Sequence, residues 1–447
     1  MKSYIKQVAA LVLLGSAGLF AACEKTDAEI DRDKTPSIEY ARYCDPDSVS
    51  PITSAYLGEK IAFIGSGMGD VREIWFNDQK ATLNPNYITS DAIIVDIPKG
   101  ISENETGKVR FVTSKGHEAL FDFKVLVPAP LMENMDCEWA EPGSIATING
   151  DYFVDDKDIP FRLVLGDGTE VPHDDITIIS RYKLTFKVPQ NAPEGFLSAT
   201  SRYGTAKSNF VFHDTRGMLF DWDGVHGQAL ARANGWRTGD GTVMNNYEGI
   251  PPLDGNYICF NGVKANYNDA QEPLYAFTHW SVYEGEGHNP GLDPSTLFDA
   301  ANFLKWQIKF EAFVPQAIPW RLCSLQAFCT PADVNNTNDY LWDEDFPRGL
   351  WTPWKNAKDE KYDTGGKWIT VSMPLKDFNK GQYGAASSQS LTPKWFKGLT
   401  FIVVYGPAPK EGENLVNVPT VIAIDNVRFA PLDEKEYLNK PFNSRKQ

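Results

Sequence analysis

The chain has 447 residues, of which 43 are basic and 59 acidic, so its net charge is −16. This charge argues against a nucleic-acid partner, because phosphate groups need a basic protein surface. The chain is longer than one hydrophobic core ordinarily supports, so we expect two to four domains. Apart from Cys23 the chain has five cysteines: Cys44, Cys137, Cys259, Cys323 and Cys329. An odd number of cysteines cannot all pair within the chain, and their spacing suggests no zinc site.

Residues 1–22 have the pattern of a signal peptide. Two lysines precede a short apolar run that ends in small residues, and this run is too short for a comfortable membrane span. The sequence Phe20-Ala21-Ala22-Cys23 resembles a bacterial lipobox, with Phe20 in the place that leucine usually takes. The resemblance implies that Cys23 is lipidated and becomes the mature N-terminus. An ordinary secretory signal with a chance cysteine is the alternative.

Residues 23–35 are highly charged and contain Ile30 as their one strongly apolar residue. Such a stretch cannot bury enough surface to order itself, so we expect a flexible tether. Acidic residues soon after the cysteine also resemble the surface-export signal of Bacteroidetes lipoproteins, which implies that the protein faces the cell exterior. A plain solvated linker is the alternative.

Two segments of similar length, residues 36–127 and 128–213, look alike. Each consists of short β-rich runs separated by Gly, Asn, Asp and Pro, a pattern typical of a small β-sandwich. The prolines of residues 127–130 predict a stiff joint between the copies. The alignment of the repeat pairs three positions of the first copy with three of the second: Ile61 with Ile145, Pro98 with Pro189, and Gly116 with Gly204.

The first copy contains the sequence IGSGMGDVREIWFNDQKA, which resembles the IPT/TIG branch of immunoglobulin-like domains. The resemblance implies a tight turn at the glycines and a role as a spacer. His117 and His173 are isolated, and the acidic residues are spread as on any acidic surface. We therefore expect both copies to form a structural arm.

Residues 214–447 differ from the repeats, because they hold ten of the twelve tryptophans. In LKWQIKFEAFVP, apolar residues from Leu304 to Ala312 alternate with polar ones, which predicts a half-buried strand with Trp306 in the core. The runs GKWITVSMPL, GLTFIVVYG and TVIAIDNVRF predict further strands. Together they indicate one large antiparallel sandwich of the jelly-roll kind. The chain as a whole is predicted to be all-β.

The order of motifs in this region is more specific than any single motif. FHDTRGMLFDWDG opens it, and ANGWR, KFEAFVP, GGKWITVSMPLKDF and IDNVRF follow. Together with the lipobox and the tandem Ig-like repeats that precede it in the chain, this order of motifs resembles the B-type surface glycan-binding proteins of Bacteroidetes polysaccharide-utilisation systems. The resemblance covers essentially the whole mature chain. It implies a non-catalytic lipoprotein of the outer membrane that holds a polysaccharide outside the cell, beside a SusC/SusD-like importer.

A neutral polysaccharide offers hydroxyl groups and flat C–H faces, so its site needs exposed aromatic rings beside amides or carboxylates. Aromatic surfaces of this kind suit β-linked chains such as β-glucan, xyloglucan or mannan. Trp351 and Trp354 have the most loop-like setting, next to Pro353, and a place in the core is the alternative for every candidate. The candidate glycan-binding residues are Trp280, Trp320, Tyr340, Trp342, Trp351 and Trp354.

Two other functions stay open at this point. Jelly rolls also carry glycoside hydrolases, which need two carboxylates at a set separation. Asp343, Glu344 and Asp345 are adjacent, so neighbouring side chains on a strand would point apart. An adhesin for a host protein or glycoprotein is the second alternative.

No cofactor is expected. A structural Ca²⁺ held by Asp425, with Asp221 or Asp223, is one hypothesis, because carboxylates and carbonyls are the ligands of this ion. The interpretation that we favour treats these residues as ordinary turn and strand-end aspartates.

Overall fold

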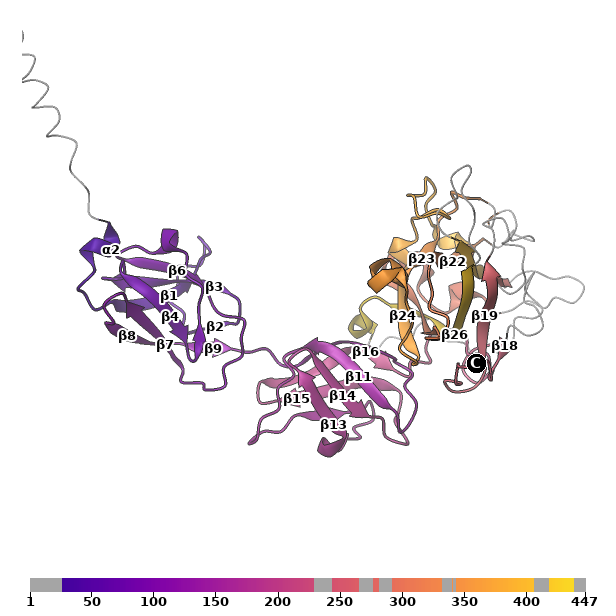
Figure 1. Ribbon diagram of the computed structural model, residues 1–447, viewed down its shortest axis with the longest axis horizontal. Helices are drawn as coiled ribbons and strands as arrows, with labels where there is room; N and C mark the ends of the chain where they lie inside the picture. Colours follow the sequence, from indigo (N-terminus) through magenta and orange to yellow (C-terminus); the bar gives the residue numbers. More distant parts are fainter. Residues whose placement is uncertain are drawn as a thin grey trace, which may run out of the picture. The chain divides into compact units, whose positions relative to one another are not determined.

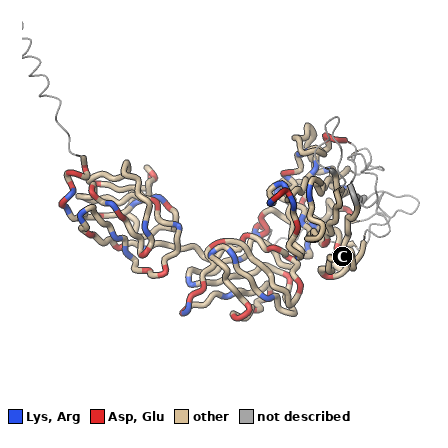
Figure 2. Tube along the Cα trace, viewed as in Figure 1, with Lys and Arg blue, Asp and Glu red and all other residues tan. Residues whose placement is uncertain are grey.

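The computed structural model describes residues 26–228, 243–264, 276–280, 292–331, 340, 343–405 and 418–437. They form two compact units, the first ending at Pro128 and the second beginning at Ala129. Strands dominate both units (Figure 1), which confirms the all-β prediction. Acidic and basic residues are interspersed along the trace (Figure 2). No helix of the described residues is long and apolar enough to cross a membrane.

The first unit is built from two antiparallel sheets, β1-β3-β6 and β5-β4-β7-β8, and a parallel pair, β2-β9. Aromatic side chains fill its core, where the rings of Phe63 and Phe111 meet edge to face with centroids 4.9 Å apart. The strands are β1 (Ser37–Tyr43), β2 (Ser54–Tyr56), β3 (Lys60–Ser66), β4 (Val71–Phe76), β5 (Gln79–Lys80), β6 (Ala92–Asp96), β7 (Lys108–Thr113), β8 (Glu118–Asp122) and β9 (Lys124–Leu126).

The segment before β1 is ordered from Thr26 onward, so the expectation of a flexible tether is wrong for residues 26–35. The short helix α2 (Asp27–Ile30) begins with a capping box between Thr26 and Glu29. Asp31 follows the helix and is fully buried, and its Oδ2 accepts a hydrogen bond from the backbone N–H of Gly69 at 2.9 Å. These polar contacts order a stretch whose composition lacks apolar anchors.

The second repeat has the same plan, with sheets β10-β11-β14-β13 and β12-β15-β16. In both repeats the first strand bulges opposite a glycine, Gly65 or Gly150. A Cβ at either glycine would lie within 2 Å of a backbone oxygen of that strand. The strands are β10 (Leu131–Met135), β11 (Ile145–Asp151), β12 (Arg162–Val164), β13 (Ile176–Ser180), β14 (Lys183–Lys187), β15 (Gly195–Ser201) and β16 (Gly204–Phe212).

This shared bulge corrects the alignment of the repeats by one residue. Ile61 is fully buried, whereas Ile145 is 57% exposed, so the two residues are not equivalent. The first residue of β11 corresponds instead to Lys60, the exposed first residue of β3. Because side chains alternate along a strand, a shift by one residue exchanges the core face for the solvent face.

The C-terminal sandwich has a larger sheet, β18-β19-β26-β21-β24 with β17 paired to β26, and a smaller sheet, β20-β25-β22-β23. Trp306 is 1% exposed, as predicted for a core residue. The strands are β17 (Met218–Phe220), β18 (Val243–Met244), β19 (Tyr257–Lys264), β20 (Ala276–Trp280), β21 (Trp306–Phe313), β22 (Cys323–Thr330), β23 (Gly349–Trp351), β24 (Ile369–Pro374), β25 (Gly398–Tyr405) and β26 (Val418–Pro431).

Strand β21 is buried on both faces, so the prediction of a half-buried strand is wrong. Its polar side chains lie under the second repeat instead of facing water. Lys309 Nζ donates to Glu138 at 2.7 Å and also to Glu434, while Arg428 binds Glu311 at 2.7 Å and Glu138 at 2.9 Å. These five residues, here called the buried ion network, join the second repeat to β21 and β26.

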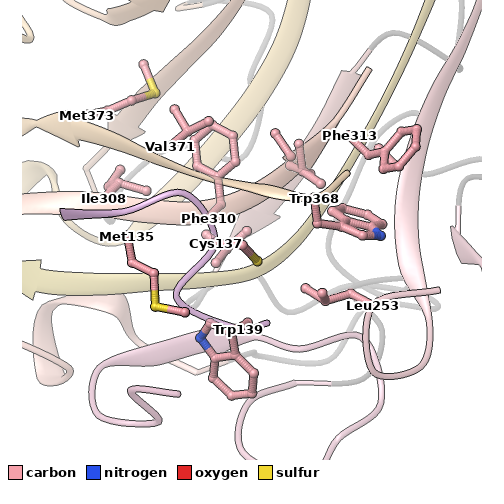
Figure 3. Close-up of a cluster of buried hydrophobic side chains, with 14 of the residues drawn as sticks. Met135, Cys137, Trp139, Leu253, Ile308, Phe310, Phe313, Trp368, Val371 and Met373 are labelled. Atoms are coloured by element: carbon pink, nitrogen blue, oxygen red, sulfur yellow. The ribbon is translucent and has the colours of Figure 1, made fainter. Parts of the chain in front are cut away.

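Apolar side chains extend the same contact between the second repeat and the sandwich. Met135, Cys137 and Trp139, which follow or end β10, lie against the side of the sandwich that carries Phe313 and Trp368 (Figure 3). Trp368 is 6% exposed, and its Nε1 donates to the carbonyl oxygen of Pro251 at 2.9 Å. One hydrophobic core therefore runs through both parts of the second unit.

Candidate functional site

Two of the candidate tryptophans, Trp320 and Trp354, are buried, with exposures of 1% and 6%. The backbone of Trp320 pairs with Tyr362 in both directions, at 2.7 and 2.9 Å. Trp354 Nε1 donates to the carbonyl oxygen of Cys323 at 2.6 Å. The expectation that these rings are exposed for stacking is therefore wrong, because both rings join the hydrophobic core.

Trp351 is half-buried at the end of the edge strand β23. Its ring meets Trp320 at 5.0 Å, Tyr362 at 5.9 Å and Phe310 at 6.3 Å between centroids, each time edge to face. Phe310 belongs to the larger sheet, so Trp351 closes the open edge between the two sheets. Part of the ring still reaches solvent, and a binding role for Trp351 stays a prediction.

Tyr340 lies elsewhere, on the outer side of the smaller sheet. It is half-buried and packs against a cluster of Phe328, Phe346, Ile402 and Val404. Trp280 is the last residue of β20, opposite Gly398 of β25 in the strand register.

Trp342 and the lipidation candidate Cys23 lie outside the described residues.

Phe346, Tyr383 and Trp395 pack on this outer side of the smaller sheet. We call the segments that carry them, residues 343–348 and 380–395, together with Tyr340, the outer layer. Phe346 is at its centre. The ring of Trp395 stacks on Phe346 at 4.9 Å and 9°, and Tyr340 meets Phe346 edge to face at 4.6 Å. Trp395 and Tyr383 are half-buried, like Tyr340, so three aromatic side chains pack on the sheet while part of each reaches solvent.

Arg348 holds the outer layer to the sheet. Its side chain is fully buried, and its guanidinium lies 5.0 Å from the centroid of the Phe328 ring. It donates to Gln326 Oε1 at 3.1 Å and to the carbonyl oxygens of Tyr340 at 3.2 Å and Asp343 at 2.8 Å. Burial lowers the pKa of Arg348 to about 10, so the group stays charged at neutral pH. The cation thereby fixes both ends of the segment that runs from residue 340 to 343.

Amide and carboxylate groups surround these rings. Gln389 Nε2 donates to Asp343 Oδ2 at 2.8 Å, and the backbone N–H of Ser388 donates to Asp345 Oδ1 at 2.9 Å. The hydrogen bonds from Ser388 hold the pKa of the Asp345 carboxyl below its usual value. Asp345 is therefore a hydrogen-bond acceptor at neutral pH and a poor general acid.

Sequence reasoning missed Trp395, Tyr383 and Arg348. Nothing in the local pattern separates Trp395 from a core tryptophan, because its half-exposure depends on Phe346, which is 49 positions away along the chain. A buried arginine with carbonyl partners has no signature in the sequence either. Both features follow from the fold of the outer layer over the smaller sheet.

Among the aspartates considered as calcium ligands, Asp221 already has hydrogen-bond donors on both of its carboxylate oxygens. Its carboxylate accepts four backbone N–H groups, from residues 224 to 227. Asp223 accepts hydrogen bonds from the backbone and side chain of Asn256. The part of the chain that the structure describes contains no group of three or more His, Cys, Asp or Glu side chains arranged for a metal ion.

Two small sandwiches in tandem precede a larger one, whose partly exposed aromatic rings and polar side chains are groups suited to binding carbohydrate. Residues 212–431 match the family model of the surface glycan-binding protein B xyloglucan-binding domain. Residues 212–431 thus belong to this family of glycan-binding domains, and the chain as a whole is similar to a B-type surface glycan-binding protein.

Individual proteins resemble the chain to different degrees. Surface glycan-binding protein PbSGBP-B from Prevotella bryantii is 29% identical, with a TM-score of 0.71 over 89% of this chain and 99% of that one. An IPT/TIG domain-containing protein of Bacteroides ovatus is 32% identical over 130 residues, which are 28% of this chain and 26% of the relative. An SGBP-B from a xyloglucan utilization locus in Bacteroides uniformis is 15% identical, with a TM-score of 0.43.

Proposed function

We propose that this protein captures a β-linked polysaccharide at the bacterial surface and that the outer layer of the C-terminal sandwich binds it. The observation that carries the proposal is the set of half-buried rings of Tyr340, Tyr383 and Trp395 around Phe346. Xyloglucan is the first ligand to test, because the matching family model is named for it. β-Glucan and mannan share the flat β-linked backbone that suits aromatic stacking.

The chemistry of the outer layer suits a neutral sugar chain. Partly exposed rings offer a face for C–H stacking, and the amides and carboxylates beside them bind hydroxyl groups. Arg348 holds the backbone at Tyr340 in place before the ligand arrives, which reduces the ordering cost of binding. The arrangement therefore supports binding, and we propose that the protein is non-catalytic.

Attachment and delivery complete the proposed function. A lipid on Cys23 would anchor the chain in the outer membrane, and the repeats would act as spacers that carry the binding sandwich outward. The partner that would receive the captured glycan is a SusC/SusD-like importer. The lipobox-like sequence and the family assignment support these steps.

Affinity gels and titration calorimetry with xyloglucan, β-glucan and mannan test the proposal on the chain from residue 24 onward. We expect Trp395→Ala and Tyr340→Ala each to lose tenfold or more in affinity, since a stacking ring contributes on the order of 1–3 kcal/mol. Their melting temperatures should fall less than that of Trp354→Ala, because Trp395 and Tyr340 are half-buried whereas Trp354 is 6% exposed.

Trp351→Ala is the matched control, because Trp351 is also half-buried but packs at the sandwich edge. If Trp351→Ala loses affinity while the outer-layer variants bind normally, the binding surface is at that edge and the proposed site is wrong. A reducing-sugar assay on the same glycans tests the hydrolase alternative. Binding to a host glycoprotein and to none of the polysaccharides would support the adhesin alternative.

A further inference from the structure

One carboxylate in the centre of the larger sheet has an oxygen without a partner. Asp425 lies in β26 and is fully buried. Its Oδ1 accepts a hydrogen bond from the backbone N–H of Asn426 at 2.8 Å, whereas Oδ2 has no hydrogen-bond donor among the described residues. Such an oxygen is costly to bury, so it needs a ligand or a proton.

A second carboxylate, that of Asp254, lies within hydrogen-bonding range of Asp425. Two acidic groups at this separation repel one another unless a cation or a shared proton lies between them. The nearest base along β26, Arg428, does not serve this purpose, because it is already bound to Glu311 and Glu138.

Asn426 supplies a third oxygen beside the two carboxylates. Its Nδ2 donates to Asp254 Oδ2 at 3.1 Å, and its Oδ1 is buried with no hydrogen-bond partner in the described chain. A half-turn of the amide exchanges the two atoms and presents Oδ1 to Asp254 in place of Nδ2. That exchange is favourable only if a cation, or the proton of a carboxylic acid, lies between the oxygens.

Asp254 also lines a pocket of about 670 Å³. Trp139 and Leu253, two of the side chains drawn in Figure 3, line the same pocket. The carboxylates of Glu141 and Asp223 are further lining groups, so the pocket is acidic.

We propose that Asp254, Asp425 and Asn426 bind a Ca²⁺ ion beside this pocket. Ca²⁺ takes oxygen ligands from carboxylates, amides, backbone carbonyls and water, and its two charges balance the two aspartates. Asp254 and Asp425 supply two carboxylates, which do not complete the coordination of Ca²⁺. The remaining ligands would be the amide oxygen of Asn426 and water.

The loop that carries Asp254 is held in place before any ion binds. Asn256 donates to Asp223 from its backbone and its side chain, at 3.0 and 2.6 Å. A Cβ at Gly255 would lie 2.1 Å from Asp223 Oδ2, so a larger residue there would displace this carboxylate. A bound ion would tie this loop to β26, and the ordering cost of binding is small for a loop that is already fixed.

Calcium titration by calorimetry, and thermal melting in CaCl₂ or EDTA, test the proposal on the protein from residue 24 onward. We expect one bound ion per chain. The melting temperature should rise by on the order of 5 °C when free Ca²⁺ exceeds its Kd about a hundredfold. Asp254→Asn and Asp425→Asn should abolish both effects, while Glu248→Gln, a change at an exposed acid of the same segment, should keep them.

A shared proton between the two aspartates is the competing explanation. In that case Ca²⁺ gives no heat and no shift in melting temperature, and Asp425→Asn melts higher than the wild type in EDTA; this result overturns the proposal. If Asp425→Asn does not fold, Asp254→Asn decides the question alone, because Asp254 lies at the pocket wall. Calcium binding that survives Asp254→Asn would also refute the site.

Discussion

Replacing Arg428 by methionine should destabilise the second unit more than the loss of any exposed ion pair. The side chain of Arg428 is fully buried, and its two Nη atoms bind Glu311 at 2.7 and 3.1 Å and Glu138 at 2.9 Å. Methionine fills much of the same volume but leaves two buried carboxylates without this cation. Breaking a buried pair in this way costs about 3–5 kcal/mol.

The loss of stability in Arg428→Met should depend on pH, and the pKa of Glu311 determines the direction of this dependence. Burial raises the pKa of its carboxyl to about 7 from 4.5, even though Arg428 acts to lower it. The folded state therefore holds this proton more tightly than the unfolded state does. Its contribution to stability is complete below pH 4.5 and is lost as the pH rises through the folded value. Without Arg428 the pKa of Glu311 in the folded state rises further. The stability of Arg428→Met should therefore fall further below that of the wild type as the pH increases from mildly acidic to mildly alkaline.

Thermal melting followed by circular dichroism measures this effect, with Arg162→Met as the matched control. Arg162 lies in the same unit and pairs with Glu170 through both oxygens, but both side chains are about half exposed. Exposed pairs contribute little, so the control should melt like the wild type at every pH. If Arg428→Met also melts like the wild type, water reaches the buried ion network and the contact between the second repeat and the sandwich is open in solution.

Four further changes have outcomes that the structure predicts. Trp354→Ala should lower the free energy of unfolding by about 3–5 kcal/mol, measured by denaturant titration, because the ring is buried and its N–H is bonded. Burial lowers the pKa of His213 from 6.5 to about 4, so stability that is complete above pH 6.5 is lost as the pH falls toward 4; His213→Asn should melt with less dependence on pH in this range. A fragment that begins at Asp214 should melt well below one that begins at Ala129, because it lacks the repeat that covers β21. Cys23→Ala should release the protein from membranes, and a variant that stays in the membrane fraction would show that the lipid anchor is not at this residue.

The plan of the repeats could be predicted from the sequence, whereas their exact register could not. Short β-rich runs between turn residues were sufficient to identify two similar domains. Ile61 and Ile145 are both isoleucine at the start of a strand, and only their burial shows that one faces the core and the other solvent. The glycines opposite the bulge, Gly65 and Gly150, align the repeats correctly, because their need for space is a property of the backbone.

The candidate site was harder to predict, because the burial of an aromatic ring depends on residues far away in the chain. Trp354 lies beside a proline and a lysine, yet its N–H finds the carbonyl oxygen of Cys323 and its ring joins the core. Tyr340 was one of the candidates, and it packs in the outer layer. Trp395 has an equally polar setting, but it is half-exposed because Phe346 supports one face of its ring.

The alternating pattern of β21 shows why the burial of a strand face cannot be predicted from the sequence of that strand alone. Lys309 and Glu311 fall on one face of the strand, and in an isolated domain that face would be solvated. Here the second repeat covers it, and the two charges are neutralised by Glu138, Glu434 and Arg428. An alternating strand therefore predicts which side chains share a face, but not whether that face meets water. A charged face beneath a neighbouring domain also requires charges on the partner, and Glu138 provides one of them from the repeat. The repeat next to the sandwich thus covers the outer face of the larger sheet, whereas the outer layer lies on the outer face of the smaller sheet.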